Sequence, residues 1–149
     1  MDNRGMGFEK MESAGYLANH MARLFATGLA ERIKPLGIVP GQFPALLELW
    51  EEDGISQRDL VRRLDVEQAT MANTLGRMER DGLIRRTRDP EDGRAQQIWL
   101  TPRAKALRKD AIAAANTQNA VALRKLSAAE RRAFVALMRR VIEAMRGDD

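Results

Sequence analysis

The sequence predicts a mainly α-helical protein with a small two-stranded β wing, an α+β winged helix-turn-helix held between N- and C-terminal helices. Three observations predict this fold class. Two short helical patterns follow one another between residues 56 and 83, and a basic hairpin pattern follows them directly. Long amphipathic helical patterns flank this unit on both sides. Their apolar faces exceed what so small a unit can cover, which predicts a second copy as partner.

Bulk properties exclude several classes of protein. With 149 residues, the chain can bury one core, so we expect a flexible segment over residues 1–12 and a single domain over residues 13–149. Charged or polar residues interrupt its apolar stretches and it lacks a signal-peptide core, which predicts a cytoplasmic protein with no membrane partner. It has no cysteine and one histidine, which excludes thiol chemistry and argues against a zinc site. We therefore expect no metal site and no cofactor.

The charge of the chain favours a polyanionic partner. Its net charge is +4 and its pI is near 9.9. Every basic residue between Pro35 and Ala104 is arginine, although arginine also predominates elsewhere, as a GC-rich genome would produce. The positions of these charges are therefore more informative than the choice of arginine.

Residues 13–36 form the first predicted dimerisation helix. Apolar residues recur at spacings of three and four and stop before Pro35. Small residues lie on the adjacent faces, so we expect another helix to approach closely. The apolar stripe comprises Leu17, Met21, Leu24, Phe25, Leu29 and Ile33.

A winged-helix lobe is expected over residues 40–101. Its first helix contains Phe43 and Trp50 and ends at Asp53-Gly54. Because proline has no N–H to donate, Pro44 should lie in the first turn of this helix and Pro40 in the approach to it. The next helix is expected to begin with a capping box between Ser56 and Asp59.

The second short helix of the lobe has one apolar side and one polar side. Met71, Leu75 and Met78 form its inner side, and it ends at Asp81-Gly82, where glycine suits a left-handed C-cap. The other side, here called the recognition face, carries short or planar polar groups in place of the Glu and Lys usual on a solvated helix. Without the wing, an exposed face of no consequence would be an equal alternative. The recognition face comprises Gln68, Ala69, Thr70, Asn73, Thr74 and Arg77.

The wing supplies the second half of the DNA-binding prediction. Residues 83–88 and 96–100 have strand-like patterns, and turn formers fill residues 89–94. A helix of this kind fits the major groove of B-DNA, and the wing would reach the neighbouring minor groove. Double-stranded DNA is therefore the predicted partner.

Residues 102–146 supply the other predicted dimerisation helices. Thr101-Pro102 is a cap followed by a first-turn proline, which opens a helix running to about Leu126. Ser127 and Glu130 form a second capping box at the start of the last helix, whose stripe is strongly apolar. A two-fold dimer would place its recognition helices about 34 Å apart, on an imperfect palindrome. The stripe comprises Phe134, Leu137, Met138, Val141, Ile142 and Met145.

Between about Tyr16 and Met145, the sequence resembles the MarR family of transcriptional regulators, and especially its SlyA-like branch. The family's dimeric winged helix-turn-helix is implied by this resemblance. The matching segments are Leu64-Asp65-Val66-Glu67-Gln68, Thr74-Leu75, Arg77-Met78-Glu79-Arg80-Asp81-Gly82-Leu83-Ile84, Asp92-Gly93-Arg94 and Leu100-Thr101.

The resemblance also implies residue roles and shows departures. It implies that Arg94 enters the minor groove with its guanidinium held by Asp92; the alternative is a surface ion pair. Asn73 stands where SlyA-like relatives place a basic base-reading side chain, and Val39 where relatives carry a Ser or Thr cap. Phosphate contacts are expected from Arg85, Arg86 and Arg88.

Family members commonly bind small aromatic anions between the dimer helices and the DNA-binding lobe. Candidate residues for such an effector site are Tyr16, His20, Arg23 and Trp50, although a lone His or Trp is more often a packing residue. Trp99 is assigned no role.

Three function classes follow from the sequence. The favoured one is a homodimeric, ligand-responsive repressor that binds a pseudo-palindromic operator. The second is a winged-helix protein-interaction module that does not bind DNA. An enzyme is disfavoured, because carboxylates such as Glu48 and Glu51 pair with no His, Cys or phosphate-binding loop.

Overall fold

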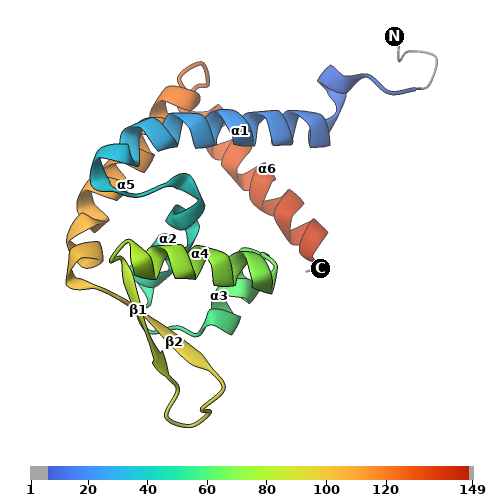
Figure 1. Ribbon diagram of the computed structural model, residues 1–149. Helices are drawn as coiled ribbons and strands as arrows, with labels where there is room; N and C mark the ends of the chain where they lie inside the picture. Colours follow the sequence, from blue (N-terminus) through green and yellow to red (C-terminus); the bar gives the residue numbers. More distant parts are fainter. Residues whose placement is uncertain (1–6, 148–149) are drawn as a thin grey trace.

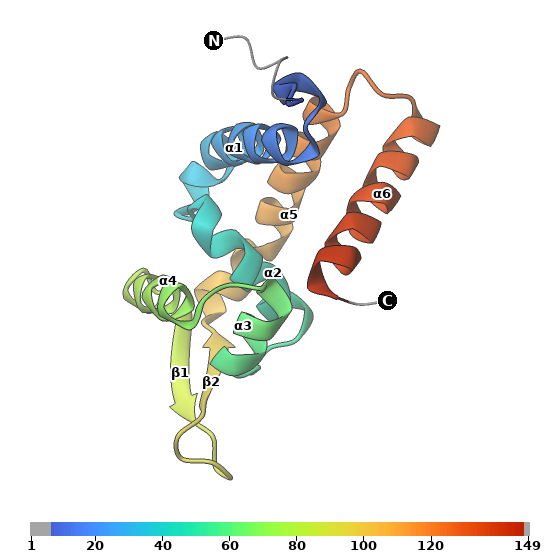
Figure 2. The ribbon, with the colours of Figure 1, turned by 90° about the vertical axis from the view of Figure 1, so that its right-hand side faces the viewer.

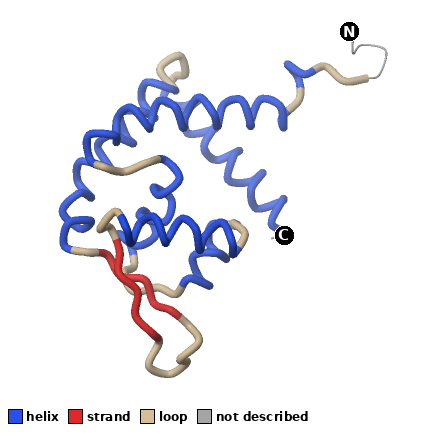
Figure 3. The backbone as a smooth tube through the Cα atoms, viewed as in Figure 1, coloured by secondary structure: helices blue, strands red, loops and turns tan. Residues whose placement is uncertain are grey.

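The structure, a computed structural model, describes residues 7–147 and is mainly helical with one antiparallel sheet (Figure 1, Figure 3). Helices α1 and α5 cross at one end, and the winged-helix lobe lies at the other with its wing pointing away (Figure 1, Figure 2). None of the helices in residues 7–147 is long and apolar enough to cross a membrane. The elements are η2 (Lys10–Glu12), α1 (Ala14–Ile33), η3 (Lys34–Leu36), η4 (Pro40–Gln42), α2 (Phe43–Glu51), α3 (Gln57–Leu64), α4 (Gln68–Arg80), β1 (Ile84–Arg88), β2 (Gln96–Leu100), α5 (Pro102–Ala122) and α6 (Ala128–Arg146).

The expected flexible segment, residues 1–12, falls partly within the structure. Residues 1–6 lie outside the described residues, and the short helix η2 precedes α1. Ser13 then caps α1, since its hydroxyl accepts from the backbone N–H of Tyr16 at 3.3 Å. The long first helix is thus confirmed.

The hydrophobic core lies in the lobe and extends to the ends of α1 and α5. Side chains from α2, α3, α4 and the wing are fully buried there, and Ile33 of α1 and Ala104 of α5 join them. At Gly28, α5 approaches α1 closely, because an added Cβ would lie 2.4 Å from the Gln118 side chain. We expected another helix to pack against the small residues of α1. At Gly28 that helix is α5 of the same chain. The largest fully buried lobe side chains are Ile38, Leu46, Leu49, Leu60, Leu75, Met78, Leu83 and Ile98.

The start of α3 forms only half of its predicted capping box. The Ser56 hydroxyl accepts from the backbone N–H of Asp59 at 3.0 Å. The Asp59 carboxylate binds the guanidinium of Arg62 at 3.0 Å and does not return a bond to Ser56. The carboxylate is thus occupied by Arg62, one turn further along the helix.

The approach to α2 begins with Val39 in place of a hydroxyl cap. Gln42 supplies the reciprocal half of a capping box from inside η4, because its Oε1 accepts from the backbone N–H of Val39 itself at 3.2 Å. Pro40 opens η4 and Pro44 lies in the first turn of α2, as predicted.

Helix α4 and the wing follow the prediction closely. Met71, Leu75 and Met78 are buried, and Gly82 adopts the left-handed conformation with φ 73°. The backbone N–H of Leu83 donates to the Met78 carbonyl at 2.9 Å, closing the helix as a Schellman-type cap. Strands β1 and β2 pair antiparallel from Ile84 opposite Leu100 to Arg88 opposite Gln96.

Trp99, to which the sequence assigned no role, supports the base of the wing. Its indole N–H donates to the Thr87 hydroxyl at 2.9 Å. Its ring packs on Gly54, where an added Cβ would lie 2.5 Å away and φ is 77°. Only glycine suits that position, since it combines a left-handed backbone with contact against an aromatic ring.

Helix α5 ends at Ala122, four residues earlier than expected. Residues 123–126 form a turn, in which the backbone N–H of Leu126 donates to the Leu123 carbonyl at 2.9 Å. Arg131 of α6 donates to the carbonyls of Leu123 and Leu126 at 3.1 and 3.2 Å. A side chain from the next helix thus satisfies carbonyls at this helix end, which lack backbone donors.

The predicted capping box at the start of α6 is complete and predicts a pH dependence. Ser127 N–H donates to the Glu130 carboxylate at 2.8 Å, and this bond holds the pKa of Glu130 below its ordinary value of 4.5. A lowered folded-state pKa adds stability above pH 4.5 that is lost as the pH falls through the folded pKa. We expect Glu130→Gln to lower the melting temperature at pH 7 and to have a smaller effect near pH 3, measured by circular dichroism. An equal effect at both pH values would contradict a role for the carboxylate charge.

Candidate nucleic-acid interface

The recognition face of α4 is open to solvent along its length. Gln68, Ala69, Thr70, Asn73 and Arg77 are exposed and Thr74 is half-buried, whereas the opposite side of the helix is buried in the core. The helix thus presents a polar side on a rigid base. This geometry is what reading base edges in a major groove requires.

The wing projects beyond the body of the lobe (Figure 2), and its sequence contains the predicted basic residues. Arg85, Arg88, Asp92 and Arg94 are exposed, and the Arg85 guanidinium lies 5.7 Å from the centroid of a Trp99 ring. A cation on an aromatic face has a restricted direction. Arg85 is therefore positioned over Trp99, and the wing exposes several positive groups to solvent.

The tip of the wing differs from the prediction in the role of Asp92. Its carboxylate accepts from the backbone N–H of Arg94 at 3.0 Å, and no ion pair joins it to the Arg94 guanidinium within residues 7–147. Asp89 acts in the same way on the backbone N–H of Glu91 at 2.9 Å. Both carboxylates shape the loop, because short acidic side chains readily bond backbone two residues ahead.

Arg86 is less available for a phosphate contact than its neighbours. It is half-buried, with Nε 3.7 Å from a Glu79 carboxylate oxygen and Nη1 3.5 Å from Oε1 of Gln96. Its Nε is buried without a hydrogen-bond partner. The side chain thus links β1 to α4. Of the three arginines predicted to contact phosphates, Arg86 is the one that is held by contacts within the protein.

Removing one exposed wing arginine should change the salt dependence of DNA binding. Each phosphate contact contributes about 0.9 to the slope of log K against log salt. We expect Arg88→Ala to reduce the slope by about one ion per half-site, and so by about two for the two-fold dimer, measured by titration at several salt concentrations. Arg108→Ala, at an exposed position on α5, is the matched control and should leave the slope unchanged. An unchanged slope for Arg88→Ala would place this residue off the DNA.

A hollow of about 500 Å³ lies between the start of α3, the start of α4 and the wing. Arg58 and Arg94 contribute to it from different elements, together with Gln57 and Gln68. The sequence analysis did not assign Gln57 or Arg58 to the interface. The available signal was their position in the first turn of a helix that directly precedes the recognition helix.

The structure brings together only some of the predicted effector residues. The rings of Tyr16 and His20 meet edge to face with centroids 6.3 Å apart, and Arg23 is exposed on the same helix. Trp50 is 7% exposed and packs against Phe43 in the core. Its indole N–H donates to the Ala104 carbonyl at 3.0 Å, so it is a packing residue.

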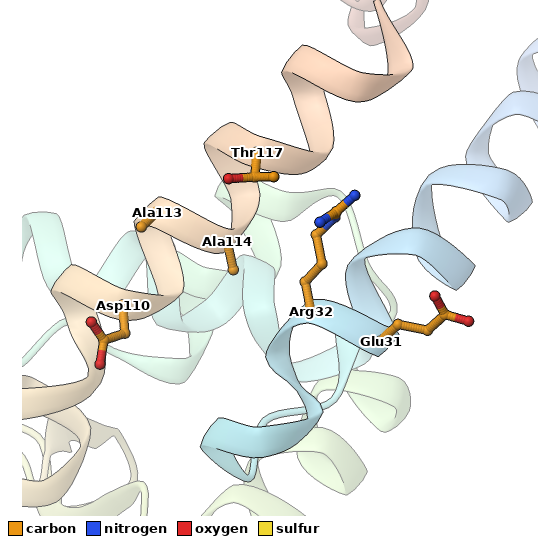
Figure 4. Close-up of a pocket in the computed structure, with 6 residues that line it drawn as sticks. All are labelled: Glu31, Arg32, Asp110, Ala113, Ala114 and Thr117. Carbon is orange, nitrogen blue, oxygen red and sulfur yellow. The ribbon is translucent and has the colours of Figure 1, made fainter.

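A second hollow, of about 590 Å³, lies between α1 and α5 (Figure 4). Arg32 extends from α1 toward α5, and its Nε donates to Oε1 of Gln118 at 3.0 Å. No predicted effector residue lines this hollow. Its lining comprises Glu31, Arg32, Asp110, Ala113, Ala114 and Thr117.

Comparison with known proteins identifies the family. The MarR family model matches residues 38–95, which run from the approach to α2 to the wing tip. The transcriptional regulator HosA of Escherichia coli O111:H- is 32% identical over 103 residues, which cover 69% of this chain and 76% of HosA. The chain belongs to the MarR family of transcriptional regulators. The HTH-type transcriptional repressor Rv2887 of Mycobacterium tuberculosis H37Rv is 28% identical over 136 residues, covering 91% of this chain and 98% of that protein.

Solved structures of MarR proteins share the same fold. A MarR regulator from Methanosarcina mazei Go1 matches with a TM-score of 0.84 and 27% identity over 89% of this chain and 96% of that one. PcaV from Streptomyces coelicolor, solved with its natural ligand, matches with a TM-score of 0.80 and 26% identity over 93% of this chain and 97% of that one. Reduced AbfR, solved bound to DNA, matches with a TM-score of 0.76 and 25% identity over 89% of each chain. The mainly helical fold with a two-stranded wing is thereby confirmed.

Proposed function

We propose that this MarR protein is a ligand-responsive repressor that binds a pseudo-palindromic site in double-stranded DNA as a two-fold homodimer. Acting on genomic DNA, it would work in the cytoplasm. The observation that carries the proposal is the joint exposure of the recognition face and the arginine-bearing wing on one lobe. A placement near the SlyA-like branch is part of the proposal and is supported by the segment from Arg77 to Ile84.

The exposed apolar side of α6 supports the dimer. No residue of α6 is buried, and Val141 on its stripe is 56% exposed. On α1, Leu24 is 62% exposed. Figure 2 shows α6 standing apart from α1 and α5, and at its end Arg146 pairs with Asp65 at 3.1 Å. A contiguous apolar surface of this kind marks a protein interface, and a second copy supplies a matching surface.

The dimer supports recognition of a symmetric site. Two recognition helices related by a two-fold axis would enter successive major grooves about 34 Å apart. Phosphate contacts from the wing would set the register, and the recognition face would select bases. A repressor of this kind responds to a ligand when binding changes the spacing of its two lobes.

The test is selection of bound fragments from genomic DNA by the purified chain, followed by a gel shift with the region upstream of its own gene. We expect enrichment of fragments that share an imperfect palindrome. If no fragment is enriched above random DNA, the repressor proposal is wrong. The winged-helix protein-interaction module would then be favoured.

We propose a small aromatic anion as effector, bound near Tyr16, His20 and Arg23. The exposed guanidinium can pair with a carboxylate, and the two rings lie close enough to contact an aromatic ligand. A thermal-shift screen with phenolic acids tests this, with stabilisation expected for the wild type and not for Arg23→Ala. No stabilisation of the wild type by any of the acids would reject this effector class.

A further inference from the structure

The C-terminal end of α4 is tied to both chain segments that connect the lobe to the long helices. One segment, residues 34–42, follows α1 and contains η3 and η4. The other is the start of α5, where the Thr101 hydroxyl donates to the Gly82 carbonyl at 2.7 Å. Any rotation of the lobe relative to α1 and α5 must act through these two segments.

Gln42 connects the first segment to α4. It is 2% exposed and is the one polar residue among the buried side chains of residues 7–147. Its Nε2 donates to Oδ2 of Asp81 at 2.8 Å, while its Oε1 accepts from the backbone N–H of Val39. Because buried amides need partners at both ends, these two bonds fix the direction of the side chain.

Arg103 connects the second segment to the same residue. Its guanidinium donates to the backbone carbonyl of Asp81 and lies against Gly37 and Gly82. An added Cβ would lie 2.8 Å from the guanidinium at Gly37 and 3.6 Å from it at Gly82. The last carbonyls of a helix lack partners and carry partial negative charge, so a cation is favourable here.

We infer that Gln42 and Arg103 are positioning residues for DNA recognition, which hold α4 through Asp81 at a fixed angle to α1 and α5. This inference rests on the proposed DNA-binding function. The two side chains bind the C-terminal end of α4, whereas the recognition face begins at Gln68, at its other end. They therefore act on base reading without touching DNA.

The length of α4 makes this angle important. A helix of 13 residues spans about 18 Å between its first and last Cα atoms at about 1.5 Å per residue, so a tilt of about 10° moves the far end by about 3 Å. Such a displacement breaks hydrogen bonds to base edges, whose range is only about 2.7–3.2 Å. Attraction to phosphates falls off more slowly with distance and would remain. Loosening this contact should thus reduce the preference for the specific site more than it reduces general DNA affinity.

The first test exchanges the donor and the acceptor between Gln42 and Asp81. Gln42→Glu places two carboxylates together, and we expect the ratio of specific to random DNA affinity to fall about tenfold. Asp81→Asn alone keeps an acceptor for Gln42 and should lower the ratio less than Gln42→Glu does. The double variant restores a donor facing an acceptor and should return the ratio to within about threefold of wild type.

The second test uses Arg103, so that the inference remains falsifiable if Gln42→Glu does not fold. Arg103→Met should lower the same ratio, while the matched charge loss Arg108→Met should not. The probes are the fragment that the wild type selects and a shuffled fragment of equal composition, at a temperature where circular dichroism shows all variants folded. Equal losses on both DNAs for Arg103→Met, or no rescue in the double variant, would overturn the inference. A wild type without any preference would overturn the proposed function itself.

Discussion

Replacing Val141 by aspartate is expected to convert the protein to a monomer and to abolish binding to its palindromic site. Val141 lies in the middle of the exposed apolar stripe of α6. Burying an unpaired carboxylate costs several kcal/mol, and a two-fold axis introduces the substitution twice. We expect the dissociation constant of the dimer to rise at least about 100-fold, measured by analytical ultracentrifugation.

Loss of site binding should follow loss of the dimer. A monomer contacts a single half-site, so it loses the affinity gained when two recognition helices bind one duplex. Ala136→Asp is the matched control, since Ala136 is exposed on α6 and lies outside the apolar stripe. This variant should remain dimeric and keep its DNA affinity. If the Val141→Asp protein is dimeric and its DNA affinity is unchanged, the apolar stripe of α6 does not lie in the dimer interface.

Replacing Asn73 by alanine is expected to cost about 1–3 kcal/mol for each half-site of the specific DNA and little on random DNA. Asn73 is exposed on the recognition face, with the buried side of α4 behind it. Asparagine pairs with adenine through two hydrogen bonds, whereas a basic side chain at this position would favour guanine. The measurement is a binding titration of both proteins on both DNAs.

The identity of the base offers a sharper check on Asn73. If Asn73 reads an adenine, replacing that base pair should cost the wild type affinity and the alanine variant almost none. Such non-additivity is the signature of a direct contact in a double-mutant cycle. Asn116→Ala, the same change at an exposed position on α5, is the control and should bind both DNAs as the wild type does. Equal losses on specific and random DNA would exclude base reading by Asn73.

The elements of this fold were predictable because their signals are local. Ser13, Thr101 and Ser127 each accept from a backbone N–H three residues ahead, and all three helix starts were found from the sequence. Gly82 ends α4 for an equally local reason. At Asp59 and at the end of α5, where the prediction was wrong, the structure has a guanidinium contact that the local pattern does not reveal. The predicted order of the elements is therefore confirmed, whereas individual helix ends differ from the prediction.

The roles of particular side chains required the tertiary structure. Trp50 was a candidate for ligand binding until its indole was found bonded to Ala104, 54 residues away. The Gln42–Asp81 bond spans 39 residues and involves no sequence pattern that would suggest it. Arg86 matched its neighbours in type and spacing, yet Glu79 holds it against α4.

The sequence by itself determined which segments are helix, wing or cap, and which side of α4 is polar. Those properties depend on side-chain periodicity and on hydrogen bonds that span three or four residues. The tertiary structure alone decided which arginines remain free for DNA, that Trp50 belongs to the core, and that two connecting segments meet at Asp81. These outcomes depend on packing between segments far apart in the chain, where a side chain binds whichever partner the fold brings within hydrogen-bond range.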